Sequence, residues 1–358
     1  MLMTKIINFL NLVCYPFTRN AKRFLVLWLL VMYSFGKLSA QDPVFSQFYN
    51  AYLQLNPAMA GNSRGPVFQM NYRNQWPGLG KIYSTYSVAY DQYLSSIKSG
   101  IGVSLLADNA GDGILRNTGV TGYYSYRIRI KGDVYVKGGF EVGLNNMALN
   151  TSKLLFGDAI DPISGPISPG GTPYPTKELI AGETSKTYLN LGAGLLLSSP
   201  DYYLGLGFKN LNTPDISFLN GENFNNGSLQ SLPVRFVLHG GTQIILRSGN
   251  KNVDPTFISP NIMIQRQRDF NQLNLGAYIS VNKVHGGLWY RHTLYNGDAL
   301  ITSFGVRKDF LKITYSFDLT LSELGLQQGG SHEVGLGLNF DYLYPKKFDY
   351  NDCNQIFR

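Results

Sequence analysis

Hydrophobic and polar residues alternate along much of the chain, and the stretch TYLNLGAGLLLSSPDYYLGLGFKN at residues 187–210 shows the pattern clearly. A β-strand sends successive side chains to opposite faces, so Leu189 and Leu191 share one face while Asn190 and Gly192 share the other. The Ser-Ser-Pro-Asp sequence in the middle predicts a tight turn. Each arm is close to the roughly 9–11 residues of a tilted strand that crosses a membrane. A hairpin in a soluble sandwich would show the same alternation.

Similar stretches recur to the end of the chain, and together they predict fourteen strands. They cover residues 66–74, 83–91, 100–108, 117–130, 133–145, 187–198, 202–210, 233–247, 256–266, 270–281, 284–292, 298–307, 310–319 and 331–343. An even number of strands is typical of a bacterial single-chain β-barrel. After residue 40 the chain has no apolar stretch long enough to predict a helical membrane span.

The connections between these stretches fall into two groups. If the mature N-terminus lies in the periplasm, four connections on that side are tight turns, at 131–133, 199–201, 282–283 and 308–309. Connections on the other side include the long segments 146–186, 211–232 and 320–330, which are rich in Gly, Pro, Asn and Ser. Short turns at one end and long loops at the other are typical of outer-membrane barrels. We therefore predict an all-β fold, a transmembrane antiparallel β-barrel at 66–344, integral to the cell outer membrane.

The face opposite the aliphatic side chains carries charged residues and glycine. Lys137, Glu141 and Arg291 occur there, and a basic residue facing lipid at the midplane would cost about 2–4 kcal/mol. Glycines such as Gly194 share this face, and a glycine inside a strand often marks the close approach of another backbone. We expect the aromatic segment 41–65 to fold into the lumen, or alternatively to lie in the periplasm. Residues 345–358 are then a C-terminal tail.

Residues 1–40 have the features of a cleavable signal peptide. Lys22 and Arg23 precede an apolar run at 24–35, and Leu38-Ser39-Ala40 offers a cleavage site. An uncleaved signal anchor is the alternative. Removing this segment deletes five basic residues and no acidic residue, so the formal net charge falls from +8 to +3. Composition therefore gives little support to nucleic-acid binding, and we expect none.

Cysteine usage and the remaining motifs do not indicate chemistry. Cys14 leaves with the signal peptide, and Cys353 alone can form no internal disulfide. His332-Glu333 is similar to the start of a zinc-binding HExxH motif, but Leu336 stands where the second histidine would be. Gly78-Leu79-Gly80-Lys81 lacks the spacing and the hydroxyl residue of a phosphate-binding loop. We expect no enzyme activity, no metal and no cofactor.

An ordered series of short stretches resembles the PorP/SprF family, outer-membrane proteins of the type IX secretion system of Bacteroidetes. The series covers residues 41–343, and Phe317 stands where the family often has Tyr. The stretches that carry the resemblance are Asp42-Pro43, Phe45-Ser46-Gln47-Phe48-Tyr49, Leu55-Asn56-Pro57-Ala58, Gly61, Arg73-Asn74-Gln75-Trp76, Leu211-Asn212 with Pro214, Trp289-Tyr290-Arg291, Tyr315-Ser316-Phe317-Asp318-Leu319-Thr320 and Gly329-Gly330-Ser331-His332-Glu333.

The resemblance implies a non-catalytic barrel that assists secretion or surface attachment of partner proteins, such as the adhesins of gliding motility. It implies three kinds of neighbour: secreted cargo with a C-terminal sorting domain, other type IX secretion components, and outer-membrane lipid. The residues that we expect to bind a partner are Phe45, Gln47, Phe48, Asn56, Pro57, Arg73, Trp76, His332 and Glu333. The alternative function is an outer-membrane channel for small hydrophobic molecules with an N-terminal plug. The alternative role for His332-Glu333 is to tie the closing strand to a loop or to the inner wall.

Overall fold

The computed structural model describes residues 42–343, with gaps at 64, 81–82, 164, 169, 173, 177–183, 219–230, 250–253, 294–296 and 322–327. All of them belong to one compact unit, residues 41–358. The expected signal peptide and C-terminal tail lie outside the described residues. Within the described part of the chain, no helix is long and apolar enough to cross a membrane.

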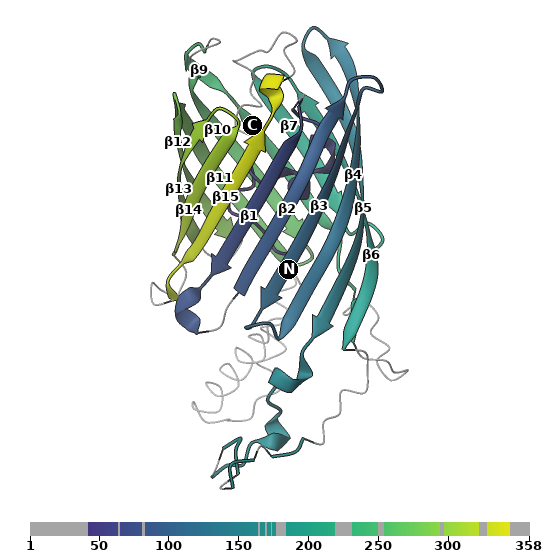
Figure 1. The fold of residues 1–358 in the computed structure, drawn as a ribbon, viewed down its shortest axis with the longest axis vertical. Coiled ribbons are helices and arrows are strands. Elements are labelled where there is room, and N and C mark those ends of the chain that lie inside the picture. Colours follow the sequence, from purple (N-terminus) through teal and green to yellow (C-terminus); the bar gives the residue numbers. More distant parts are fainter. Residues whose placement is uncertain are drawn as a thin grey trace, which may run out of the picture. The chain divides into compact units, whose positions relative to one another are not determined.

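One antiparallel sheet closes on itself into a barrel, with β1 paired to β15 (Figure 1). β8 and β9 both pair with β10 and are separated only by Gln243, so they act as one interrupted strand. The barrel thus has the fourteen strands that the alternation predicts, which confirms the expected fold. The strands are β1 (Val67–Gln75), β2 (Tyr83–Leu94), β3 (Ser99–Ala110), β4 (Leu115–Lys131), β5 (Val134–Leu149), β6 (Ser185–Ser198), β7 (Tyr202–Lys209), β8 (Arg235–Thr242), β9 (Ile244–Arg247), β10 (Thr256–Gln267), β11 (Phe270–Val281), β12 (Val284–Thr293), β13 (Gly297–Lys308), β14 (Leu311–Thr320) and β15 (Ser331–Asn339).

Burial along each strand follows the predicted alternation. On β14, Ile313 and Tyr315 are 40% and 45% exposed, whereas Thr314 and Ser316 between them are 0% exposed. The aliphatic and aromatic face therefore points outward, and the polar face points into the barrel. Every described strand except β9 pairs with a neighbour on both sides, and a closed ring of this kind is what allows a sheet to stand in lipid.

The two ends of the barrel differ in their connections. One end, here called the short-turn end, has the turns 95–98, 132–133, 199–201, 282–283 and 309–310, together with one longer connection, 248–255. Asn282 and Asp309 take left-handed backbone angles there, which short polar side chains tolerate. The other end, here called the long-loop end, has the long connections 150–184, 210–234 and 321–330, the connection 76–82, and the short connections 111–114, 268–269 and 294–296. The three longest connections between strands thus lie at one end, as the sequence predicts, although short connections occur at both ends.

Short helical turns occur only outside the described strands. β15 ends before residue 343, the end that the sequence predicts, because the carboxylate of Asp341 turns back to accept the backbone N–H of Gly65 at 2.7 Å. The helical elements are α3 (Tyr52–Leu55), η1 (Pro57–Met59), η2 (Pro77–Leu79), η3 (Thr151–Lys153), η4 (Gly157–Ala159) and η6 (Asp341–Leu343).

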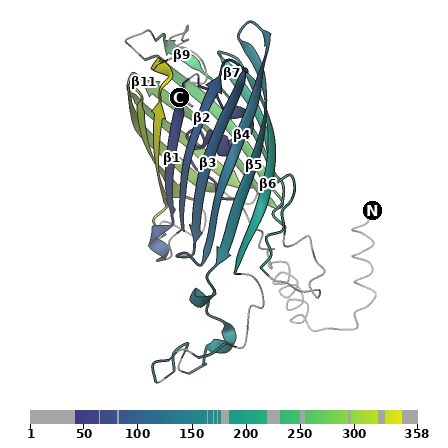
Figure 2. The ribbon, with the colours of Figure 1, turned by 45° about the vertical axis from the view of Figure 1, so that its right-hand side comes forward.

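The hydrophobic core lies inside the ring of strands. The largest fully buried side chains include Trp289 and Phe257 from the wall and Tyr49 and Tyr52 from the chain before β1. In both views this N-terminal stretch, coloured purple, lies within the barrel (Figure 2). The core therefore combines apolar side chains of the wall with apolar side chains of the N-terminal residues.

Candidate functional site

The candidate site is the interior of the barrel together with residues 42–65, here called the lumenal segment. Its side chains from Phe45 to Ala60 are buried, with the exception of Gln54, which is half-buried. Strands all around the ring form hydrogen bonds with this segment. These contacts extend from Asp42 at its start to Gly65 at its end.

The first anchor is a buried group of charges around Ser46. The carboxylate of Glu333 accepts the backbone N–H groups of Ser46 and Gln47 at 2.7 and 3.1 Å. The Ser46 hydroxyl donates to the carboxylate of Asp318 at 2.6 Å. Charge-assisted hydrogen bonds of this kind are short and about twice as strong as neutral ones.

Two guanidinium groups balance these carboxylates. Arg73 contacts Asp318 at 3.0 Å and Glu333 at 3.3 Å. Arg291 contacts Asp318 at 2.5 Å and Asp298 at 2.5 Å. Both arginines also hydrogen-bond the Ser46 hydroxyl. Because Arg73, Asp318 and Glu333 are at most 4% exposed, each charge depends on its partners for the solvation that it has lost.

The next residues add amide and aromatic contacts. The side-chain amide of Gln47 donates to the Ser316 hydroxyl and to the Glu333 carbonyl, both at 3.1 Å. The ring of Tyr49 stacks on Trp289 with centroids 5.2 Å apart, and Phe48 meets the same indole edge-on at 6.3 Å. Aromatic pairs of this kind contribute about 0.5–1.5 kcal/mol beyond their burial.

The middle of the segment is held by Asp91 and Arg235. The carboxylate of Asp91 accepts the Tyr52 hydroxyl and the backbone N–H of Gly61, both at 2.7 Å. Arg235 donates to the backbone carbonyl of Gln54 at 2.9 Å. Asp91 therefore joins two points of the segment nine positions apart, which fixes the turn between them.

Asn56 caps the short helical turn η1 and reaches the wall at the same time. Its side-chain oxygen accepts the backbone N–H of Ala58 at 2.9 Å, as an N-cap residue does. Its amide nitrogen lies 3.0 Å from the Leu195 carbonyl and 3.0 Å from the ring of His239. Pro57 follows at the first helical position, where no backbone N–H is needed.

Inward-facing glycines let this part of the segment touch the wall. A Cβ placed on Gly139 would lie 2.6 Å from the Ala58 Cα, and one on Gly207 would lie 2.7 Å from the Leu55 carbonyl oxygen. Such distances are shorter than real Cβ contacts, so any side chain would push the backbone of the segment away. The predicted close approach of another backbone to these glycines is thus present. Toward the C-terminal end of the lumenal segment, Lys137 and Ser125 both donate to the Ala60 carbonyl at 2.8 Å.

The segment runs from one end of the barrel to the other. Asp42 accepts hydrogen bonds from Asn210 at 3.0 Å and Gln267 at 3.3 Å, at the long-loop end. Gly65 meets Asp341 at the short-turn end, where β1 begins. The sequence analysis took a periplasmic N-terminus as a condition and left open whether residues 41–65 enter the lumen. In the described structure Asp42 lies at the long-loop end, and the chain passes through the lumen before β1 begins at the short-turn end.

Most of the residues expected to bind a partner lie in or against the lumenal segment. Phe45, Gln47, Phe48, Asn56 and Pro57 are buried within it. Arg73 and Glu333 are the wall residues that hold Ser46. Binding of a second protein by these residues stays a prediction, because in the described structure they belong to the lumenal segment or contact it.

Two of the expected residues lie elsewhere. His332 faces outward, where its ring nitrogen meets the Tyr315 hydroxyl at 2.7 Å, so it does not join Glu333. Trp76 stands at the long-loop rim, with its ring 5.9 Å from that of Tyr83. Sequence reasoning missed Asp318, Asp91 and His239 as wall contacts. Their inward positions could be read from the alternation, but their partners could not.

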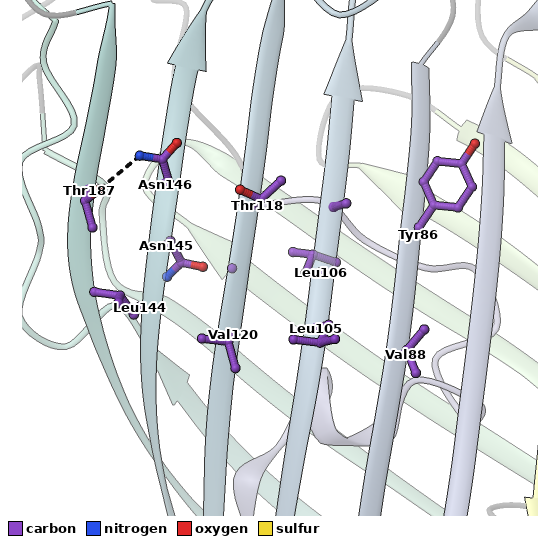
Figure 3. A pocket seen from close by; sticks show the side chains of 12 residues that line it. Tyr86, Val88, Leu105, Leu106, Thr118, Val120, Leu144, Asn145, Asn146 and Thr187 are labelled. Atoms are coloured by element: carbon purple, nitrogen blue, oxygen red, sulfur yellow. Dashed lines mark hydrogen bonds between the residues drawn. The ribbon is translucent and has the colours of Figure 1, made fainter.

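A separate hollow of about 570 Å³ lies on the wall formed by β2 to β6 (Figure 3). Most of its lining is at outward positions, such as Val88, Leu105, Val120 and Leu144, and none of the lining residues is charged. On the polar side, Asn146 donates to Thr187 at 2.9 Å. This hollow therefore belongs to the face that meets acyl chains, and it is distinct from the lumenal site.

Comparison with solved structures finds other barrels. The toluene transporter TodX of P. putida shares 12% identity over 81% of this chain and 94% of that chain, with a TM-score of 0.49. The outer membrane protein Omp33 of Acinetobacter baumannii shares 9% identity over 78% of this chain and 100% of that chain, with a TM-score of 0.41. A Pseudomonas aeruginosa FadL homologue shares 12% identity over 79% of this chain and 89% of that chain, with a TM-score of 0.40.

Comparison with protein families gives a match over most of the chain. Among curated proteins there is no significant match. The family model described as the type IX secretion system membrane protein PorP/SprF matches residues 37–338. A closed barrel with an aliphatic exterior is one of the two structures that can span a bilayer, so fold and family agree on an integral outer-membrane protein. The chain belongs to the PorP/SprF family of type IX secretion system membrane proteins.

Proposed function

We propose that this protein is a non-catalytic barrel component of the type IX machinery that assists the secretion or surface attachment of partner proteins, such as gliding adhesins. The expected partners are cargo carrying a C-terminal sorting domain and other components of the same machinery. Membership of the family supports the link to secretion. The role as a binding protein rests on what occupies the interior.

The observation that carries the proposal is the occupation of the lumen by the protein's own segment. Contacts run from Asp42 at one mouth to Gly65 at the other. Buried carboxylates such as Glu333 and Asp91 hold backbone N–H groups of that segment, which supports a structural use for them over a catalytic one. A partner protein would then meet the barrel at its ends, and a small molecule would find no free path along the line that the segment takes.

An arm at the long-loop end offers a surface of the right kind. Residues 150–176 project from the barrel in both views (Figure 2). Internal bonds order the arm: Asp161 and Gly165 exchange backbone hydrogen bonds of 2.9 and 2.8 Å. Yet Leu155 is 59% exposed, Ile163 98% and Ile167 53%. Ordered, exposed aliphatic side chains are typical of protein–protein contact sites.

The test replaces the gene by arm variants and measures the secreted proteins displayed on whole cells. Ile163→Asp removes an exposed apolar side chain and should lower display several-fold at an unchanged level of the barrel. Gly170→Asp adds the same charge on the same arm, at a position where a new Cβ would meet only the Ser168 hydroxyl, at an ordinary contact distance of 3.8 Å, so display should stay normal. Unchanged display in a strain that lacks the whole gene would refute the proposed function.

A planar-bilayer measurement separates this proposal from the channel alternative. Purified wild-type protein should give little steady ion conductance, because the lumenal segment fills the lumen along its length. Deleting residues 42–60 should open a conducting path through the same barrel. High, steady conductance of the wild-type protein would instead favour a channel.

A further inference from the structure

The contacts of the lumenal segment show where each of its parts lies along the barrel axis. Ser46 meets Glu333, near the start of β15, and Asp318, near the end of β14. In an antiparallel ring these two positions belong to the same end of the barrel, and both lie next to the connection 321–330. The beginning of the segment is therefore at the long-loop end.

The contacts of Asp42 independently place the beginning of the segment at the long-loop end. Its contacts are Asn210, just after β7, Arg235, the first residue of β8, and Gln267, the last residue of β10. All three stand at the long-loop end, on the opposite side of the ring from β15. Pro43 and Val44, which follow, are half-buried at the mouth.

The other end of the segment lies at the opposite mouth. Lys137, near the start of β5, donates to the Ala60 carbonyl, and Asp91, near the end of β2, accepts the Gly61 N–H. The Phe340 N–H then donates to the Pro66 carbonyl at 3.0 Å, beside the first residue of β1. Residues 42–65 thus travel the full length of the lumen before the first strand returns.

The two ends can be assigned to the two sides of the membrane. Outer-membrane barrels have short turns on the periplasmic side and longer loops on the outside. The turns 132–133, 199–201, 282–283 and 309–310 mark the short-turn end as periplasmic. Asp42 then lies at the outer mouth, on the same side as the arm at 150–176.

We propose that residues 42–65 are a further membrane-crossing segment, which runs through the lumen and presents the first residues of the processed chain at the cell surface. At this mouth Arg235 lies 3.6 Å from the Asp42 carboxylate, and Pro43 and Val44 follow Asp42 along the segment.

The arrangement also requires the leader to be removed. A leader kept in the inner membrane would have to reach the outer mouth while residues 45–60 fill the lumen. Hydrogen bonds at both mouths, from Gln267 to Asp42 and from Gly65 to Asp341, leave the segment no slack for a second pass along the same path. The cleaved form of residues 1–40, and not the uncleaved anchor, fits this geometry.

Cysteine labelling of whole cells tests the proposal. In a Cys353→Ser background, Val44→Cys and Pro43→Cys are each treated with a membrane-impermeant maleimide, before and after the outer membrane is permeabilised. Ile163→Cys on the arm is the outer control and Asp133→Cys in a short turn is the periplasmic control. Folding of each variant is checked by the shift that an unheated barrel shows in gel electrophoresis.

At least one of the two mouth variants should label on intact cells to the same fraction as Ile163→Cys, while Asp133→Cys labels only after permeabilisation. Failure of both mouth variants to label on intact cells overturns the proposal, as does labelling of Asp133→Cys but not Ile163→Cys. Cysteine labelling measures topology alone. The labelling can therefore contradict the proposed topology in a protein on which secretion still depends. It can equally support that topology in a protein that secretion does not need.

Discussion

The two halves of the lumenal segment are held by different forces. Residues 45–50 are held by charge: Glu333 and Asp318 accept their N–H and O–H groups, and arginines balance the carboxylates. Residues 55–60 are held mainly by shape: their backbone lies against strand glycines where no Cβ would fit, and Lys137 and Ser125 add hydrogen bonds to the Ala60 carbonyl. The first half depends on the chemical identity of a few side chains in the wall, and the second half depends on side chains that the wall lacks.

This difference has consequences for how each half responds to change. Removing one member of a buried charge group leaves its partners unsolvated, and nearby water cannot easily replace it. Adding one methyl group to a glycine leaves every polar contact in place but moves the backbone that makes them. Substitutions should therefore destabilise the two halves for different reasons. In residues 45–50 a charge loses its partner, and in residues 55–60 the backbone is displaced.

Asp318→Asn should have the largest effect, because it leaves Arg73 and Arg291 without the carboxylate that they share. Breaking a buried ion group in this way costs about 3–5 kcal/mol. The measurement is the free energy of unfolding in detergent, from denaturant titration. Asp133→Asn is the matched control, since Asp133 and Arg129 are 70% and 62% exposed and such pairs contribute about 0–1 kcal/mol. Equal losses in both variants would contradict the assignment of the buried group as an anchor.

Gly139→Ala should have the next largest effect, about 1–3 kcal/mol as for other overpacked sites. The new Cβ would stand 2.6 Å from the Ala58 Cα, so the segment must shift or leave. The neighbouring Gly138→Ala is the control, because its Cβ would point outward and meet only Leu195 at 4.0 Å. Ion conductance should rise in Gly139→Ala and stay at the wild-type level in Gly138→Ala. Identical behaviour of the two variants would mean that the wall does not depend on bare glycine at this position.

The same contrast explains how far the sequence could go. Alternation is local, so the faces of strands such as β14 and the inward position of Gly139 could be predicted from neighbouring residues. The meeting of Arg73, Asp318 and Glu333 depends on the stagger between strands that are far apart in the chain, and no local pattern encodes that stagger. His332 and Glu333 lie on opposite faces of β15 for a simpler reason, because adjacent residues of a strand face opposite sides.

Asn56→Ala should have the smallest effect of the three, and it tests whether the second half also needs a polar contact. The change removes the cap of η1 and leaves the ring of His239 without its neighbour at 3.0 Å, while Gly139 and Gly207 keep their close approach to the backbone. Loss of an N-cap costs about 0.5–2 kcal/mol, and this sets the scale of the expected loss of stability. Asn56→Asp keeps the cap oxygen but loses the amide, so it should recover only the part of the stability that belongs to the cap. Unfolding titrations of the two variants measure the difference directly. If Asn56→Ala proved as damaging as Asp318→Asn, the second half would also be held mainly by polar groups, and the contrast between charge and shape would not stand.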